Sequence, residues 1–166
     1  MTSPTATPAF PQTRTHLQQA ITVIGIELRT TNLQAMQSIP PHWGRFTQEG
    51  VLARIDQRVN DEVFAVYTHF ENAGNNNTGL YSLVIGAAVP ASAPVPAGMV
   101  RVVIPASPRI AFAVPAGRFD LVGPGWLAVW AQSDLPKTFV AEYEHYQANG
   151  DITISIGLSS GTGSGA

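Results

Sequence analysis

Two glutamates on one predicted strand are the residues of this chain best placed for chemistry. Glu142 and Glu144 are two residues apart in segment 139–146, so on a strand their carboxylates point to the same face, about 7 Å apart along the backbone. A solvated acidic edge would explain this spacing, because charged side chains are rarely buried without a partner. The other interpretation places Glu144 in an aromatic cavity. The spacing alone leaves both open.

Other chemistry finds little support in the sequence. The four histidines have no metal-ligand spacing, so we expect no metal site; they are His16, His42, His69 and His145. The chain has no cysteine, which excludes thiolate zinc sites and thiol nucleophiles and is typical of a reducing compartment, so we expect a cytoplasmic protein. Neither a Ser/His/Asp arrangement nor a dinucleotide fingerprint is present, so no cofactor is expected and no standard enzyme class is supported.

The three tryptophans are candidates for a pocket wall. Trp43, Trp126 and Trp130 all lie in predicted helical segments. Trp126 and Trp130 are four residues apart and therefore face the same way on a helix. Packing in the core and lining of a pocket both explain them, and the sequence does not decide between the two.

Composition limits the class of protein. The 166 residues are 45% hydrophobic and 12% charged, with a formal net charge of −2, which indicates one globular domain. With only nine Lys and Arg residues, the chain has no basic stripe that would neutralise a phosphate backbone, so direct nucleic-acid binding is not expected. The charge-free stretch 72–100 contains three prolines and an Asn run, which exclude a membrane-spanning helix.

The first half of the chain has the pattern of a β-α-β-β unit. Segment 21–28 is β-branched and predicts a strand, and Asn32 then offers a helix cap. Apolar spacing predicts a helix over 33–55, broken in two at Pro40-Pro41 because a proline disfavours helix before it. Segments 62–70 and 80–89 predict two further strands, joined by the Gly/Asn-rich loop 74–79.

The second half repeats this order after a Pro/Ala connector at 90–98. Strands are predicted at 100–104 and 109–114, a helix within 119–132, and a hairpin of 138–147 with 152–158. Aligning 63–70 with 139–146 places Tyr67 on Tyr143 and His69 on His145, and a five-residue insertion then places Gly86 on Gly157. We therefore predict an internal duplication. The expected organisation is a flexible arm at 1–20, one domain at 21–158 with halves 21–90 and 98–158, and a flexible tail at 159–166.

The predicted hairpin assigns the two faces of its strands. A two-residue Asn149-Gly150 turn pairs Glu144 with Ser155. The face expected to pack on helices then carries Phe139, Ala141, Tyr143, Ile154 and Ile156, and the opposite face carries Glu142, Glu144, Tyr146, Thr153 and Ser155. The matching face of the first-half strand is Phe64, Val66, Thr68 and Phe70, which is too apolar to be left wet, so something should cover it.

These pieces together resemble a known family. The quoted elements are Ile24-Gly25, Ile39-Pro40 leading to Trp43 and Phe46, Val66-Tyr67, the run from Gly79 to Leu83 leading to Gly86, Ile104-Pro105-Ala106, and Tyr143-Glu144-His145-Tyr146. Their order is similar to that of the GyrI-like small-molecule-binding domain, also called the AraC-type effector-binding domain, over residues 21–158. The resemblance implies an α+β fold of duplicated β-α-β-β units with pseudo-twofold symmetry, in which helices pack on one face of an antiparallel sheet, as in SOUL-like proteins.

The resemblance also implies a ligand site. In the family, the Glu of an aromatic-Glu-x-Tyr element lies among aromatic rings near the pseudo-twofold axis and attracts lipophilic cations, which carries over to Glu144, with Tyr146 as the Tyr of the element. Trp43 and Tyr81 fall on matching aromatic positions. Phe46, which follows Trp43 in the quoted element, is also expected in the site, and Tyr67, Trp126 and Trp130 are added from the residues themselves. Two departures affect the second half: Gly157-Leu158 stand where the family commonly has a proline, and Gly123-Pro124-Gly125 interrupts the predicted helix.

The implied function is that of a stand-alone effector-binding protein. It would bind hydrophobic, cationic small molecules and be related to the sensor domains of multidrug-responsive transcription regulators, with an arm before Ile21 too short for a DNA-binding domain. One alternative is a hydrolase of cyclopropane-containing compounds, in which Glu144 is a general acid or base. Another is an adaptor that binds a protein such as DNA gyrase. A protein partner is possible in each case, and no membrane association is expected.

Overall fold

The fold is an α+β arrangement of one sheet and a few helices. A computed structural model describes residues 10–159. The strands are β1 (Gln12–Leu17), β2 (Ile21–Thr30), β3 (Val63–Thr68), β4 (Tyr81–Val89), β5 (Val100–Ile104), β6 (Ser107–Val114), β7 (Ala141–Tyr146) and β8 (Ile152–Gly157). The helices are α1 (Ala35–Gln48), α2 (Val51–Arg54) and α3 (Val122–Ala131), with a 3₁₀ turn η1 (Phe119–Leu121) before α3.

The strand order shows the predicted duplication. The eight strands form one antiparallel sheet in the order β1-β6-β8-β7-β3-β4-β2-β5. Strands β3 and β7 are neighbours at the centre, and β4 and β8, then β2 and β6, flank them at equal distance. The sheet is therefore pseudo-symmetric about the β3–β7 seam, and the predicted fold class is confirmed.

The expected flexible arm is wrong for the part of it that the structure describes. Residues Gln12–Leu17 form the edge strand β1, which pairs with β6 of the second half, just as β5 pairs with β2 of the first half. The two halves therefore exchange their edge strands. Just before β1, the Phe10 side chain is only 7% exposed and packs in the core under α3. Residues 1–9 of the predicted arm, and residues 160–166 of the predicted tail 159–166, lie outside the described residues.

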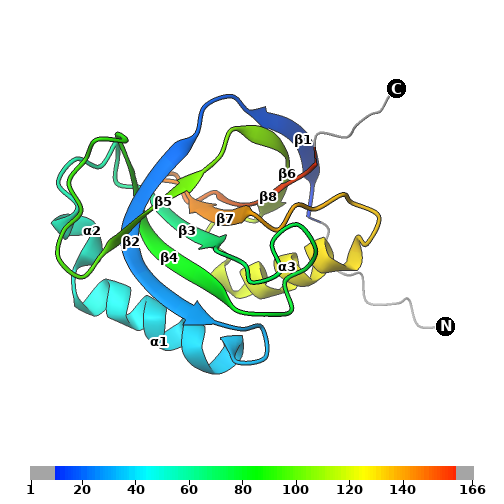
Figure 1. The fold of residues 1–166 in the computed structure, drawn as a ribbon, viewed down its shortest axis with the longest axis horizontal. Coiled ribbons are helices and arrows are strands. Elements are labelled where there is room, and N and C mark those ends of the chain that lie inside the picture. Colours follow the sequence, from blue (N-terminus) through cyan, green and yellow to red (C-terminus); the bar gives the residue numbers. More distant parts are fainter. Residues whose placement is uncertain (1–9, 160–166) are drawn as a thin grey trace.

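The sheet curls so strongly that it covers part of itself. Val66 and Val84 on the inner face of the curl pack with Val102 and Ile104 of the edge strand β5, and Ala141 of β7 belongs to the same cluster. This confirms the prediction that the apolar face containing Phe64 and Val66 is covered, and part of that cover is the edge strand β5. The helices lie outside the curl, with α1 and α3 along its outer side (Figure 1). We call this outer side the helix-covered face.

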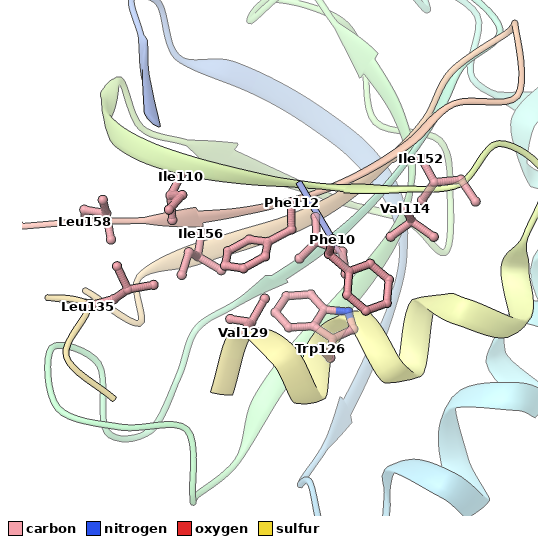
Figure 2. Close-up of a cluster of buried hydrophobic side chains, with 11 residues drawn as sticks. Phe10, Ile110, Phe112, Val114, Trp126, Val129, Leu135, Ile152, Ile156 and Leu158 are labelled. Carbon is pink, nitrogen blue, oxygen red and sulfur yellow. The ribbon is translucent and has the colours of Figure 1, made fainter. Parts of the chain in front are cut away.

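Two cores lie under the helices. On one side, α1 and α2 cover Ile24 and Ile26 of β2 and Ala87 of β4. On the other, α3 packs Trp126 and Val129 onto an apolar cluster of β6 and β8 (Figure 2). Among the described residues, no helix is long and apolar enough to cross a membrane.

Helix α1 is continuous through Pro40 and Pro41, so the predicted break at these residues is wrong. A proline cannot donate to the carbonyl four residues earlier, which frees the carbonyls of Met36 and Gln37. Both residues and both prolines are on the exposed side of α1, where water can bond these carbonyls. The helix instead stops at Gly50, whose φ of 58° is a left-handed conformation, and α2 follows it.

The second helix is also not interrupted where expected. Gly123-Pro124-Gly125 lies in the first turn of α3, where a proline lacks no helical hydrogen bond. Gly125 has a packing role, because a Cβ there would lie 2.7 Å from Ile154 Cδ1. This glycine lets α3 approach β8 closely and brings Trp126 down onto the sheet.

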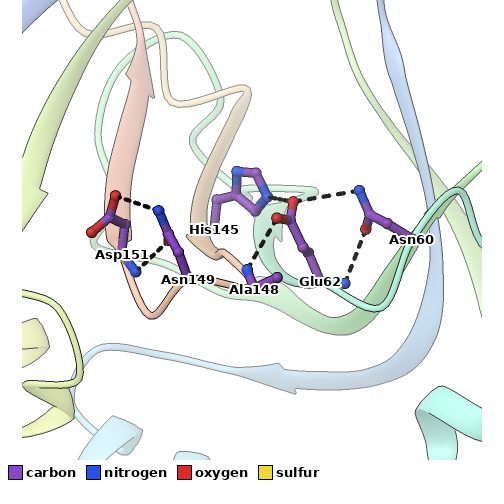
Figure 3. Close-up of polar contacts among 6 residues, drawn as sticks. All are labelled: Asn60, Glu62, His145, Ala148, Asn149 and Asp151. Atoms are coloured by element: carbon purple, nitrogen blue, oxygen red, sulfur yellow. Dashed lines mark hydrogen bonds and ion pairs between the residues drawn. The ribbon is translucent and has the colours of Figure 1, made fainter.

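The β7–β8 hairpin differs from the prediction by one residue. Glu144 pairs with Ile154 rather than Ser155, because the turn has three residues. Gly150 N–H donates to Gln147 O, and Gly150 itself is left-handed at φ 95°, the signature of a type I turn with a bulge. Figure 3 shows how side chains fix this loop: Asn149 bonds Asp151, and Glu62 accepts from the Ala148 N–H.

This shift of one residue places the side chains of β7 on the faces opposite to those predicted. Glu144 and Tyr146 lie with Ile154 on the helix-covered face, whereas Ala141 and Tyr143 lie inside the curl. The predicted assignment of faces was therefore wrong for β7. The alignment of Tyr67 with Tyr143 is also wrong, because Tyr67 shares the face of Glu144 and Tyr143 does not.

A pair of glycines lets two neighbouring strands of the first half approach closely. Gly25 of β2 pairs with Gly86 of β4, and a Cβ on Gly86 would lie 1.8 Å from the Ile24 carbonyl oxygen. The obstacle is backbone, which cannot move without distorting the sheet. Gly44 in α1 is the opposite case, since a Cβ there would meet no atom within 4 Å.

We expect Gly86→Ala to lower the free energy of unfolding by about 3 kcal/mol, because of the overlap with backbone. Gly44→Ala, the matched control, should raise it by roughly 0.5–1 kcal/mol, because alanine favours helix more than glycine does. Urea denaturation of both variants measures these changes. Equal stability of the two variants would contradict the close approach of the β2 and β4 backbones at Gly25 and Gly86.

Candidate functional site

Glu144 is a buried carboxylate held by three neutral donors. Its side chain is 2% exposed. Oε2 accepts hydrogen bonds from the Tyr67 hydroxyl at 2.7 Å and from the Trp126 Nε1–H at 2.6 Å, and Oε1 accepts one from the Tyr146 hydroxyl at 2.5 Å. Glu142 is also buried, at 3% exposure. The interpretation of the two glutamates as a solvated acidic edge is therefore wrong.

Three elements position these donors. Ala65 of β3 pairs with Glu144 of β7, so Tyr67, two residues along β3, lies diagonally across the seam and within reach. Tyr146 stands two residues after Glu144 on the same strand and face. Trp126 comes from α3, which Gly125 allows to approach the sheet. The site thus lies at the pseudo-symmetric seam and uses both halves of the chain.

The electrostatics of the site leave Glu144 without a counter-charge. Burial raises its pKa, and the hydrogen bonds from Tyr146, Trp126 and Tyr67 partly offset this. Burial also raises the pKa of Tyr67 and of Tyr146, and the charge on Glu144 adds to it, so both phenols stay protonated donors. In residues 10–159, no Lys, Arg or His forms an ion pair with Glu144.

The predicted aromatic residues surround this carboxylate. On one side, Trp43 of α1 contacts Tyr146 edge to face, with ring centroids 5.4 Å apart, and Phe46 packs on Trp43 at 5.9 Å. On the other side, Tyr67 contacts both Tyr81 of β4, at 5.8 Å, and Trp126, at 5.1 Å.

Trp130, one turn after Trp126, lies 6.1 Å from it and is 41% exposed. Ring contacts and hydrogen bonds thus join all eight predicted site residues into one cluster: Glu144, Tyr146, Trp43, Tyr81, Tyr67, Phe46, Trp126 and Trp130. Their role in ligand binding stays a prediction.

Two further residues of the cluster were missed by the sequence analysis. Phe119 of η1 stacks on Tyr146, with centroids 5.9 Å apart and an angle of 28° between the rings, while 69% of Phe119 is exposed. Its position at the start of a predicted helix gave no signal of this contact. Asn32 accepts a hydrogen bond from the Tyr81 hydroxyl at 3.0 Å. The prediction of Asn32 as a helix cap is wrong, since the residue before α1 is Gln34.

Two surface hollows among the described residues lie away from Glu144. One of about 370 Å³ is lined by Phe64 and His145 of the inner face and by Glu62. Another, of about 500 Å³, lies beside Phe46 and Val51. Neither is lined by Glu144, whose surroundings are filled by the rings that bond to it. Because only 2% of Glu144 is exposed, its own side-chain neighbours close the site.

Glu142, two residues before Glu144 on β7, has a different environment. Burial raises its pKa to about 7, and the positive charges of Arg109 and Lys137 limit the rise. Arg109 is buried on the inner face, where it donates to Ser155 Oγ at 2.7 Å and to Ala141 O at 2.7 Å, with its guanidinium over the Tyr143 ring. Glu142 is therefore a buried acid that titrates near neutral pH.

We expect Glu142 to make stability depend on pH. Its pKa is about 7 when folded and near 4.5 when unfolded, so between these values the folded chain holds the extra proton, and stability falls by about 3 kcal/mol as pH rises through this window. Glu142→Gln removes this loss. Thermal unfolding should show the variant more stable than the original chain near pH 8, with the advantage gone near pH 4.5. Parallel pH curves for the two proteins would refute this.

Solved structures show the same fold in three other proteins. An integron cassette protein from the mobile metagenome of Vibrio cholerae, VCH_CASS2, matches with a TM-score of 0.71 and 20% identity, over 90% of this chain and 97% of that one. The protein SAV2435, whose structure was determined bound to tetraphenylphosphonium, matches with a TM-score of 0.71 and 18% identity, over 92% and 95%. A protein from Staphylococcus aureus MU50, described as a bacterial transcription regulation protein, matches with a TM-score of 0.67 and 18% identity, over 90% and 97%.

Comparison at the level of sequence families gives the assignment. No curated protein matches the chain. The family model Cass2, described as integron-associated effector binding protein, matches residues 18–157, which spans all but the first strand of the described fold and includes every residue of the aromatic cluster. The chain is therefore a member of the Cass2 family of integron-associated effector-binding proteins.

Proposed function

We propose that this protein binds hydrophobic cations, with Glu144 as the charge that attracts them and the surrounding rings as the apolar walls. The observation that carries the proposal is a fully buried carboxylate that has three neutral donors and, in residues 10–159, no cationic partner. An ionised carboxylate in such surroundings is costly, and a bound cation would relieve that cost.

The rings add a second source of affinity. Ring faces attract cations by about 0.5 to 2 kcal/mol each, and aromatic surface also contributes hydrophobic contact. Neither contribution depends on a particular arrangement of ligand atoms. A site built from one carboxylate and several rings should therefore select for charge and hydrophobicity more than for shape, and accept several ligands.

The relatives support this class of ligand. Tetraphenylphosphonium, bound by SAV2435, is a hydrophobic cation that cannot donate a hydrogen bond, so charge and aromatic contact are what such a ligand offers. The Staphylococcus aureus relative is described as a transcription regulation protein, which favours a sensing role for this chain. We propose that ligand binding here signals to a regulatory partner, as in the sensor domains of multidrug-responsive regulators.

A titration with ions of equal shape and opposite charge tests the proposal. Tetraphenylphosphonium should quench tryptophan fluorescence with micromolar affinity, because Trp126 bonds directly to Glu144, whereas tetraphenylborate should not bind. Glu144→Gln should weaken cation binding at least about tenfold, or 1.4 kcal/mol. The matched control is Glu142→Gln, a buried acid on the same strand, which should change affinity by less than about threefold. Equal binding of the two ions, or equal losses in both variants, would refute the proposal.

Cation affinity should also fall in acid. Burial raises the pKa of Glu144, and only the ionised form attracts a cation, so affinity should be constant above that pKa and drop about tenfold for each pH unit below it. Fluorescence titrations from about pH 5 to 9 measure this. Glu142→Gln should keep the same pH profile and Glu144→Gln should lose it, which identifies the acid responsible. If Glu142→Gln abolished the pH dependence of cation affinity, that dependence would belong to Glu142 and the proposal would be contradicted.

A further inference from the structure

The Tyr146 side chain occupies a slot between two parts of the chain. Trp43 of α1 meets its ring edge to face, and Phe119 of η1 stacks on it. At the inner end, its hydroxyl donates to Oε1 of Glu144, which accepts no other hydrogen bond from the described residues. An aromatic ring with a polar group directed at the carboxylate is also what a bound aryl cation would present.

We propose that Tyr146 takes the place of the ligand's aromatic group in the unliganded protein and leaves the slot between Trp43 and Phe119 when an aryl cation binds. This inference rests on the proposed function and adds the residue that moves, the position of the ligand and the class of ligand. The ligand carries at least one planar ring thin enough to lie between Trp43 and Phe119.

Among the three donors, Tyr146 is the one free to move. Trp126 is 8% exposed and belongs to the core cluster of β6 and β8. Tyr67 is the second-last residue of β3, and its ring is held between those of Tyr81 and Trp126. Tyr146 is half-buried and is the last residue of β7, next to the hairpin loop. Its departure breaks one hydrogen bond and leaves the other two on Oε2 intact.

Phe119 offers a ring face that a ligand can contact once Tyr146 has left the slot. A phenylalanine that is 69% exposed contributes little to the core, yet one face of its ring is held against Tyr146. When Tyr146 leaves, that face is available to stack on the ligand. Phe119 is therefore a residue that favours planar aromatic cations over aliphatic ones of equal charge.

Association kinetics separate this role from that of a fixed wall. Tyr146→Phe keeps the ring and removes its bond to Glu144, and since bonds to charged groups are roughly twice as strong as neutral ones, the ring should leave more readily. Stopped-flow tryptophan fluorescence with tetraphenylphosphonium should show association at least about tenfold faster than in the original chain. Tyr67→Phe, which removes a bond to the other oxygen of the same carboxylate, should stay within about threefold. Equal rates in all three proteins, or equal acceleration in both variants, would overturn the proposal.

A second variant tests the slot without relying on a large ligand. Tyr146→Ala empties the slot, so benzylammonium should bind this variant at least about tenfold more tightly than the original chain. Adding Phe119→Ala should remove most of that gain. Adding Leu127→Ala, which truncates a side chain 63% exposed on another side of α3, should not.

The two experiments distinguish the possible failures. If the original chain ignores tetraphenylphosphonium while Tyr146→Ala binds benzylammonium, the slot is confirmed and the proposed function fails. If the original chain binds the cation through Glu144, but Tyr146→Phe has unchanged rates and Tyr146→Ala gains nothing, the displacement of Tyr146 is refuted alone. If no variant binds either cation, both proposals are overturned. Should Tyr146→Ala fail to fold, the rates of Tyr146→Phe decide.

Discussion

A carboxylate removed from water must be hydrogen-bonded, and this requirement at Glu144 determines how the parts of the fold must meet. Its three donors come from β3, β7 and α3, so the central seam of the sheet and the helix above it must be held in register to a fraction of an ångström. The close approach of α3 at Gly125 and the bulged turn at Gly150 serve this registration. Either one in a different form would move a donor or turn Glu144 to the other face.

The duplication explains why the site has a single acid. The two halves can be superposed by matching Gly86 of β4 with Gly157 of β8. Gly25 pairs with Gly86 and Arg109 pairs with Gly157, so Gly25 is equivalent to Arg109. In the same register, the partners of Tyr67 and Glu144 are equivalent, so Tyr67 is equivalent to Glu144. The two halves thus put a phenol and a carboxylate at equivalent positions across the seam, where they bond to each other. Two carboxylates at those positions would repel and raise each other's pKa. The broken symmetry gives one negative charge and its donor at the same time.

Strand positions were predictable because β-branched residues mark them, and β5 was predicted to the residue. Strand β1 was not, because Gln12–Leu17 is a polar edge strand that is exposed except at Leu17 and has no apolar alternation. Its existence could have been inferred from the repeat, since β5 in the second half has no other counterpart in the first. The face of β7 depended on whether the turn had two or three residues. Asn149-Gly150 is compatible with both, and a difference of one residue turns every side chain of the strand to the opposite face.

The candidate site was predictable in part. The family resemblance indicated Glu144 and Tyr146 as candidates. The contact of Phe119 with Tyr146 joins a 3₁₀ turn to a strand, and no periodicity in the sequence indicates it.

A closed site has a thermodynamic consequence for the ligands it can hold. The bonds from Tyr67, Trp126 and Tyr146 let Glu144 be buried without a cation, and they also compete with any cation that arrives. The free energy of binding is then what the ligand's own interactions contribute, less the cost of breaking a hydrogen bond and a ring stack inside the protein. Affinity is therefore lower than the number of rings would suggest. Such a site cannot hold one ligand extremely tightly, but it disfavours neutral molecules, which offer nothing to the carboxylate in return for the broken hydrogen bond. In the sensing role proposed here, which requires response to several cations and their release, this balance is an advantage, and it follows from filling the site with its own tyrosine.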